Sequence, residues 1–99
     1  MTLEEVRQKI DEIDSQLLPL FQARMDCARE VAAIKKEAGL PVLNPEREQA
    51  ILDRVAQRAG EYGGAARVLY STLMEVSRGL QHSLLDDGGG FRALVEGAK

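Results

Sequence analysis

Residues 22–36 read QARMDCAREVAAIKK (Gln22 to Lys36) and lie in the middle of a long run with helical periodicity. Apolar residues recur along this run at alternating steps of three and four: Leu3, Val6, Ile10, Ile13, Leu17, Leu20, Cys27, Val31 and Ile34. Such a stripe is the face that a helix buries against its partners. Arg24 occupies the position between Leu20 and Cys27 where the stripe requires an apolar side chain. A guanidinium is always charged and costly to bury unpaired, so Arg24 predicts an anion partner.

The stripe predicts one long helix that runs from the start of the chain to about Ala38. Thr2 followed by Glu5 is a capping-box pattern, and Gly39 suits the position just after a helix end. A helix of this length spans roughly 50 Å and is too long to fold back on its own core, so we expect it to pair with a second copy. Pro19 costs about 3 kcal/mol in a helix interior and predicts a bend.

Two shorter helices are predicted after it. Asn44 followed by Pro45 is a typical helix start, and that helix runs to about Ala59. The segment GEYGG, residues 60–64, predicts a loop, and a third helix with a leucine-rich stripe runs from near Ala65 to about residue 85. With no strand pattern, the prediction is an all-α chain of three helices. Residues 1–85 form one helical domain, and residues 86–99 form a Gly-rich tail that is either disordered or a linker.

Composition excludes several classes of function. The 99 residues are 44% hydrophobic and carry a net charge of −3, which argues against a nucleic-acid or anionic-membrane partner. No stretch approaches 18 apolar residues and the N-terminus has no apolar signal region, so we expect no membrane span and a cytoplasmic location. The single cysteine, Cys27, falls on the stripe and is interpreted as a small buried hydrophobe.

Basic residues on the long helix predict a local anion site. Lys35 lies eleven residues after Arg24 and only ~20° round the helix, with the small Ala28 between them. Two cations that face one gap make a good receptor for a dianion. Arg7, seventeen residues before Arg24, points ~100° away, and it would join the site of a second copy if two long helices run antiparallel.

The shorter helices add matching polar residues. Arg47 and Glu48 lie one turn before the apolar face of the second helix, and Ser77 and Gln81 flank the stripe of the third. No nucleophile–base pair and no metal-ligand spacing is recognisable, so we expect no metal and no cofactor. An enzyme with this site would act through binding and charge placement.

Each residue also has a simpler interpretation. Arg24 could pair with an acid across the bundle, such as Glu48, and Lys35 could be a solvated lysine that favours the dipole at a helix end. Arg7 could be an i, i+4 partner of Asp11 on the surface. The set as a whole favours a shared site.

Taken together, the sequence resembles the all-α (AroQ-class) chorismate mutase family. The resemblance covers about residues 3–85 and rests on LEEVRQKIDEID, RMDCAREVAAIKK, NPEREQAIL and SRGLQ. It implies an intertwined homodimer of three-helix chains with one long N-terminal helix. It also implies an isomerase that converts chorismate to prephenate by an intramolecular Claisen rearrangement, for phenylalanine and tyrosine biosynthesis.

The resemblance implies a role for each site residue. Arg24 and the partner subunit's Arg7 bind the two carboxylates of the substrate, assisted by Ser77. Lys35 and Gln81 donate to the ether oxygen. Glu48 accepts from the ring hydroxyl. The complete set comprises the catalytic Lys35, Gln81 and Glu48 and the substrate-binding Arg7, Arg24, Arg47, Ser77 and Asn44. Asn44 stands where the family usually has aspartate, and we expect it to keep the helix-cap role.

Three alternatives remain open from the sequence. An isochorismate-pyruvate lyase of the same fold shares the basic pocket, although Glu48 directly after Arg47 favours the mutase. A non-catalytic helical dimerisation module would not bind chorismate, and loss of the Arg24 charge would leave it unchanged or more stable. The tail could also connect this domain to another shikimate-pathway enzyme.

Overall fold

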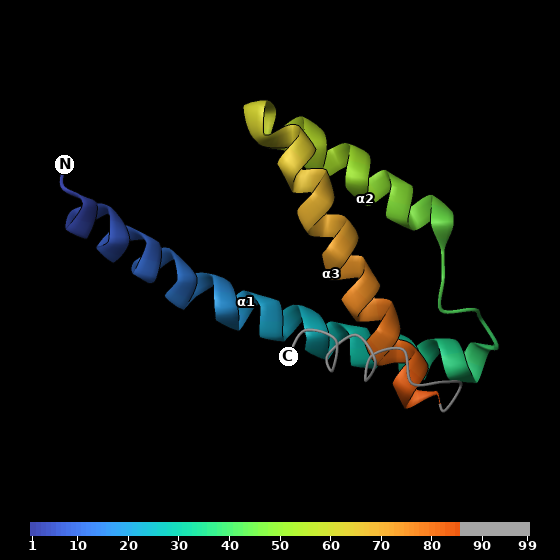
Figure 1. Cartoon of the computed structure of the whole chain (residues 1–99). Coiled ribbons are helices and arrows are strands. Elements are labelled where there is room, and N and C mark those ends of the chain that lie inside the picture. Colours follow the sequence, from blue (N-terminus) through green and yellow to red (C-terminus); the bar gives the residue numbers. More distant parts are fainter. Residues whose placement is uncertain (86–99) are drawn as a thin grey trace.

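The computed structural model describes residues 1–85, and in that part of the chain all regular structure is helical. Helix α1 spans Leu3–Ala38, α2 spans Pro45–Arg58 and α3 spans Gly63–Leu84, with a 3-10 turn at Gly60–Tyr62 (Figure 1). The predicted all-α, three-helix chain is therefore confirmed. The third helix begins slightly earlier than predicted, because Gly60–Tyr62 form a 3-10 turn and Gly63 and Gly64 already belong to α3. The predicted tail, residues 86–99, lies outside the described residues.

The ends of α1 follow from local chemistry. The Thr2 side chain accepts a hydrogen bond from the backbone N–H of Glu5 at 3.1 Å, which satisfies one of the free donors of the first turn. Gly39 has a φ of 68°, in the left-handed region where glycine ends helices without a Cβ penalty. Between these ends α1 is continuous across Pro19, so the bend predicted there does not break the helix.

Helices α2 and α3 form a tight antiparallel hairpin. Asn44 caps α2, since its side chain accepts from the backbone N–H of Arg47 at 3.1 Å, and Pro45 follows in the first turn. A Cβ at Gly63 would lie 2.7 Å from the carbonyl oxygen of Ala56, so glycine is required where α3 starts against α2. Ile51 of α2 and Met74 of α3 are buried in the packed region.

Helix α1 contacts the hairpin only through its C-terminal half. Ala28 and Ala32 are 5% and 1% exposed, and their small side chains allow α1 to pack closely on α3. The N-terminal half extends away from the hairpin as an arm (Figure 1), and the longest dimension of the molecule is 53 Å.

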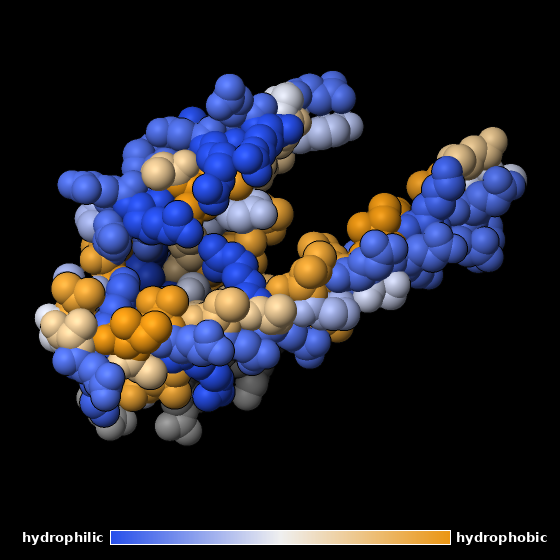
Figure 2. Space-filling view, turned by 180° about the vertical axis from the view of Figure 1, so that it is seen from behind, coloured by the Kyte–Doolittle hydropathy of each residue, from blue (hydrophilic) through white to orange (hydrophobic). Residues whose placement is uncertain are grey.

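The arm carries an uncovered apolar surface. Figure 2 shows apolar side chains along it, on the side that faces the open angle between α1 and the hairpin. Its exposed large apolar residues are Leu3, Val6, Ile10, Ile13, Leu17, Leu18 and Leu20. The apolar stripe predicted from the sequence is thus present, but this chain alone does not bury it: Cys27, Val31 and Ile34 of its C-terminal part are exposed as well, and the residues of α1 that are buried are Ala28 and Ala32. None of the described helices has the length and apolar character needed to cross a bilayer.

Candidate active site

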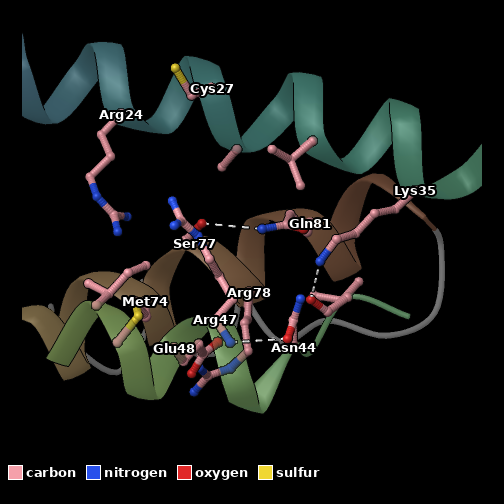
Figure 3. A pocket seen from close by; sticks show the side chains of 14 residues that line it. Arg24, Cys27, Lys35, Asn44, Arg47, Glu48, Met74, Ser77, Arg78 and Gln81 are labelled. Carbon is pink, nitrogen blue, oxygen red and sulfur yellow. Dashed lines mark hydrogen bonds and ion pairs between the residues drawn. The ribbon is translucent and has the colours of Figure 1, made fainter. Parts of the chain in front are cut away.

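A cavity of about 290 Å³ lies between α1 and the α2–α3 hairpin (Figure 3). Each helix contributes side chains spaced i, i+3, i+4 and i+7, the spacing that places residues on one helix face. The lining residues are Arg24, Cys27, Ala28, Val31 and Lys35 from α1; Asn44, Arg47, Glu48 and Ile51 from α2 and its cap; Met74, Ser77, Arg78 and Gln81 from α3; and Val42 from the link. Every site residue predicted from the sequence except Arg7 is in this set.

The cavity is strongly basic. Arg24, Lys35, Arg47 and Arg78 line it, and Glu48 is its one carboxylate, which gives a local excess of three positive charges. The whole chain has a net charge of −3, so this excess is a local arrangement. A cavity with several cations and low-dielectric walls attracts small anions, and a ligand with two carboxylates matches it best.

Lys35 is fixed above the cavity by the backbone. Its Nζ donates a hydrogen bond to the carbonyl oxygen of Val42 at 2.6 Å, and Val42 is itself buried. An ammonium group has three donors, so two remain for a ligand. The link between α1 and α2 therefore orients Lys35. The sequence pattern predicted Lys35 as a site residue but not this hydrogen bond.

Gln81 is the most deeply placed polar side chain of the site, at 6% exposure. Its Nε2 donates to the Ser77 hydroxyl at 3.3 Å, one turn earlier on α3 (Figure 3). Its Oε1 has no hydrogen-bond partner within residues 1–85. A 180° rotation of the Gln81 carboxamide group would let Oε1 accept a hydrogen bond from the Ser77 hydroxyl. Either orientation leaves at least one N–H of Nε2 available to a ligand.

Glu48 pairs with a residue that the sequence prediction missed. Arg78 Nη1 donates to Glu48 Oε1 across the α2–α3 interface, and the two side chains are 30% and 23% exposed. The simpler interpretation in which Glu48 pairs with Arg24 is therefore wrong, because Glu48 bonds to Arg78 instead. The signal for Arg78 was its spacing, since it lies four residues after Met74 and three before Gln81 on the face that carries both.

Arg24 extends from α1 toward the hairpin (Figure 3) and is half-buried. It makes no ion pair within residues 1–85, where the two ion pairs are those of Arg78 with Glu48 and Arg67 with Asp53. The same part of the chain has no group of three or more His, Cys, Asp or Glu side chains placed to hold a metal ion. The anion partner predicted for Arg24 is thus not an acidic side chain of the described residues.

Arg7 and Cys27 of α1 are both exposed in this chain. Arg7 is exposed on the arm, about 25 Å along the helix from Arg24, so it does not reach the cavity of its own chain. The prediction that Cys27 is buried is wrong, because its side chain is exposed in this chain. Ala28 faces α3, and the preceding residue points about 100° away, which turns Cys27 toward the cavity and solvent.

Comparison with known proteins agrees with this geometry. Residues 6–82 match the family described as chorismate mutase type II, over most of the chain and across all three helices. The chain belongs to this chorismate mutase family. Members of the family catalyse the isomerisation of chorismate to prephenate.

Individual relatives of the chain support its assignment to the chorismate mutase family. A chorismate mutase of Methanocaldococcus jannaschii is 36% identical over 88 residues, which cover 86% of this chain and 89% of that protein. A bifunctional chorismate mutase/prephenate dehydratase of Aquifex aeolicus is 40% identical over 63 residues, 63% of this chain but 17% of that longer protein. The solved structure of a conserved hypothetical protein from Pyrococcus furiosus superposes with a TM-score of 0.65 at 36% identity, covering 82% of this chain and 96% of that one.

Proposed function

We propose that this cavity binds chorismate and catalyses its rearrangement to prephenate, with residues of two chains around each substrate. The observation that carries the proposal is a cavity with four cations and one carboxylate in a chain of the chorismate mutase family. The rearrangement requires neither proton transfer nor a covalent intermediate. The cavity therefore has to hold one folded conformation of the substrate and stabilise the charge that develops in it.

Arg24 binds a substrate carboxylate. It is half-buried, extends into the cavity and has no acidic partner within residues 1–85, so its charge is available to a ligand. A guanidinium can bind a carboxylate through two parallel hydrogen bonds, which fixes orientation as well as position. Ser77, on the opposite wall of the cavity, supplies a further hydroxyl.

Lys35 and Gln81 stabilise the breaking ether oxygen. Both have an N–H group left after the hydrogen bonds to Val42 and Ser77 are counted. Both are held by packing or by the backbone before the substrate arrives, so little reorganisation is needed during the reaction. Preorganised donors of this kind are usually the largest electrostatic contribution in an active site.

The first turn of α2 binds the ring hydroxyl. Glu48 faces the cavity and accepts from that hydroxyl, and Arg47 lies beside it on the same turn. Asn44 fixes this turn through its cap bond to the backbone N–H of Arg47, so a role for Asn44 in holding the site does not require contact with substrate. The carboxamide performs the capping that an aspartate would also perform.

The active form is a homodimer in which the partner subunit's Arg7 completes the site. A second cavity, about 560 Å³, lies beside Arg24 between the arm and α3, and apolar side chains dominate its lining: Leu17, Leu18, Leu20, Phe21, Leu69, Tyr70 and Leu73. A second α1 that runs antiparallel to the first would cover this surface and the exposed stripe. If the two-fold axis passes near residue 15, the partner subunit's Arg7 lies opposite Arg24.

The direct experiment is to add chorismate to the purified protein, follow its ultraviolet absorbance and identify the product. Prephenate as the product supports the proposal. Absence of chorismate consumption contradicts it and favours the dimerisation module, whereas release of pyruvate from isochorismate favours the lyase. The variant Arg24→Ala should lose turnover, while Arg67→Gln, which changes an exposed arginine outside the cavity, serves as the matched control.

A further inference from the structure

Arg78 lines the cavity, and the proposed mechanism gives it no contact with substrate. It lies on the inner face of α3, between Ser77 and the buried Gly79, and its side chain crosses to Glu48 on α2 (Figure 3). The bond joins Arg78 Nη1 to Glu48 Oε1, and both side chains are mostly shielded from solvent. An ion pair shielded in this way is screened less by water and salt than an exposed one.

A second ion pair between the same two helices differs from the Arg78–Glu48 pair in its exposure to solvent. Arg67 Nη2 lies 3.2 Å from Asp53 Oδ1, with side-chain exposures of 46% and 60%, and neither residue lines the active-site cavity. Exposed pairs of this kind contribute little to stability. The α2–α3 hairpin therefore has one solvated ion pair at its surface and one shielded pair inside the cavity.

The shielded pair has two physical consequences for Glu48. A glutamate side chain rotates about several bonds, and a bond to a residue of the facing helix restricts it to one orientation. The arginine also offsets the negative charge of Glu48, which would otherwise repel the carboxylates of a dianionic substrate in the same small cavity. A carboxylate can accept about four hydrogen bonds, so it can still accept from a ligand hydroxyl while bound to Arg78.

We propose that Arg78 is a positioning residue that holds Glu48 against the ring hydroxyl of the substrate and so sets the preference for a ring that carries that hydroxyl. The inference rests on the proposed function and adds to it a specificity determinant. Arg78 acts through Glu48 and not on the reacting ether oxygen, so the larger part of its contribution depends on the hydroxyl being present, and the smaller part is the compensation of the Glu48 charge.

The test compares two substrates, chorismate and its analogue with hydrogen in place of the ring hydroxyl. Arg78→Gln should lower kcat/KM for chorismate about 10-fold or more, the size expected when a hydrogen bond to a charged group is weakened. For the deoxy analogue the same variant should lose clearly less, about 2- to 3-fold, because the hydroxyl contact is absent and only the lost charge compensation of Glu48 remains. Arg78→Lys, which keeps the charge, should recover most of the chorismate activity.

Arg67→Gln is the control, because it removes the exposed ion pair between the same helices and should leave kcat/KM unchanged for both substrates. Adding Arg78→Gln to a Glu48→Gln protein should have little further effect, since the residue through which Arg78 acts is already altered. Circular dichroism shows whether each variant folds. If Arg78→Gln does not fold, Arg78→Met replaces it in the same kinetic comparison.

An equal loss on both substrates, or a full loss that persists in the Glu48→Gln background, would overturn the role of Arg78 and leave the proposed function standing. Failure of the unmodified protein to convert chorismate would instead remove the proposed function, and the inference with it. The two failures are therefore distinguishable in one set of measurements.

Discussion

The two halves of α1 have the same apolar periodicity and different surroundings. In the C-terminal half, Ala28 and Ala32 are buried against α3, and Arg24 and Lys35 face the cavity. In the N-terminal half, Val6, Ile10, Ile13, Leu17 and Leu20 are all exposed. Helix propensity and capping explain the whole helix equally well, so they cannot explain this difference.

The difference comes from what is available to cover each half. The hairpin of α2 and α3 is shorter than α1 and crosses it within its C-terminal half (Figure 1), so it leaves the N-terminal half uncovered. The uncovered half has the larger side chains, whereas the covered half has alanine at its closest contacts. A contiguous apolar surface of this kind marks an interaction site. The C-terminal half of α1 thus packs on the hairpin of its own chain, whereas the N-terminal half presents an apolar surface that fits the homodimer we propose.

The largest effect is expected from a charge on the arm. Ile13→Asp would place a carboxylate in the interface that we propose, and an unpaired buried charge is strongly unfavourable. We expect loss of the dimer and, because the partner subunit's Arg7 is withdrawn, a fall in activity of more than about 100-fold. Sedimentation and turnover measure the two effects. Gln8→Asp, on another face of the arm, is the control, and an unchanged dimer in Ile13→Asp would show that the stripe has another role.

Lys35→Ala tests the covered half. Removing one preorganised donor to a developing oxyanion should lower kcat about 100-fold or more, with the fold retained. Steady-state kinetics with chorismate separate kcat from KM. A change confined to KM would assign Lys35 to substrate binding alone and place the stabilisation of the ether oxygen elsewhere.

Mixing two inactive variants, one altered in each half of α1, tests both halves in a single activity measurement. In the dimer that we propose, Arg7→Ala lacks the arginine that acts in the partner subunit's site, and Arg24→Ala lacks the arginine that acts in its own cavity. In a heterodimer, one site should lack both arginines and the other should be intact, so an equal mixture should recover about a quarter of the unmodified activity. If the mixture stays inactive although heterodimers form, each site is built from a single chain.

The smallest effect is expected at the contact between α1 and α3. Ala32→Leu would force a larger side chain into a position that is 1% exposed, at a cost of about 1–3 kcal/mol in the free energy of unfolding. Thermal unfolding followed by circular dichroism measures it. Ala33→Leu, at the exposed neighbouring position, should change stability little. Equal effects of the two substitutions would mean that α1 does not pack on α3 through this face.

Most of the fold could be predicted from local patterns. Thr2, Gly39 and Asn44 each end or begin a helix through hydrogen bonds or backbone angles within a few residues, and the structure confirms all three. The exposure of Cys27 could not be predicted, since an apolar stripe identifies one face of a helix but not whether another element covers that face. The hydrogen bonds of Lys35 to Val42 and of Arg78 to Glu48 could not be predicted either, because each joins residues from different segments of the chain.

The sequence by itself determined three helices, their ends to within about two residues, and which polar residues share a face with which apolar ones. These properties depend on a few neighbouring residues and on the 3.6-residue period of the helix. Only the tertiary structure decided that Glu48 pairs with Arg78, that Arg24 makes no ion pair within residues 1–85, and that the arm of α1 is uncovered. Those outcomes depend on distances between segments far apart in the chain, which no local pattern contains.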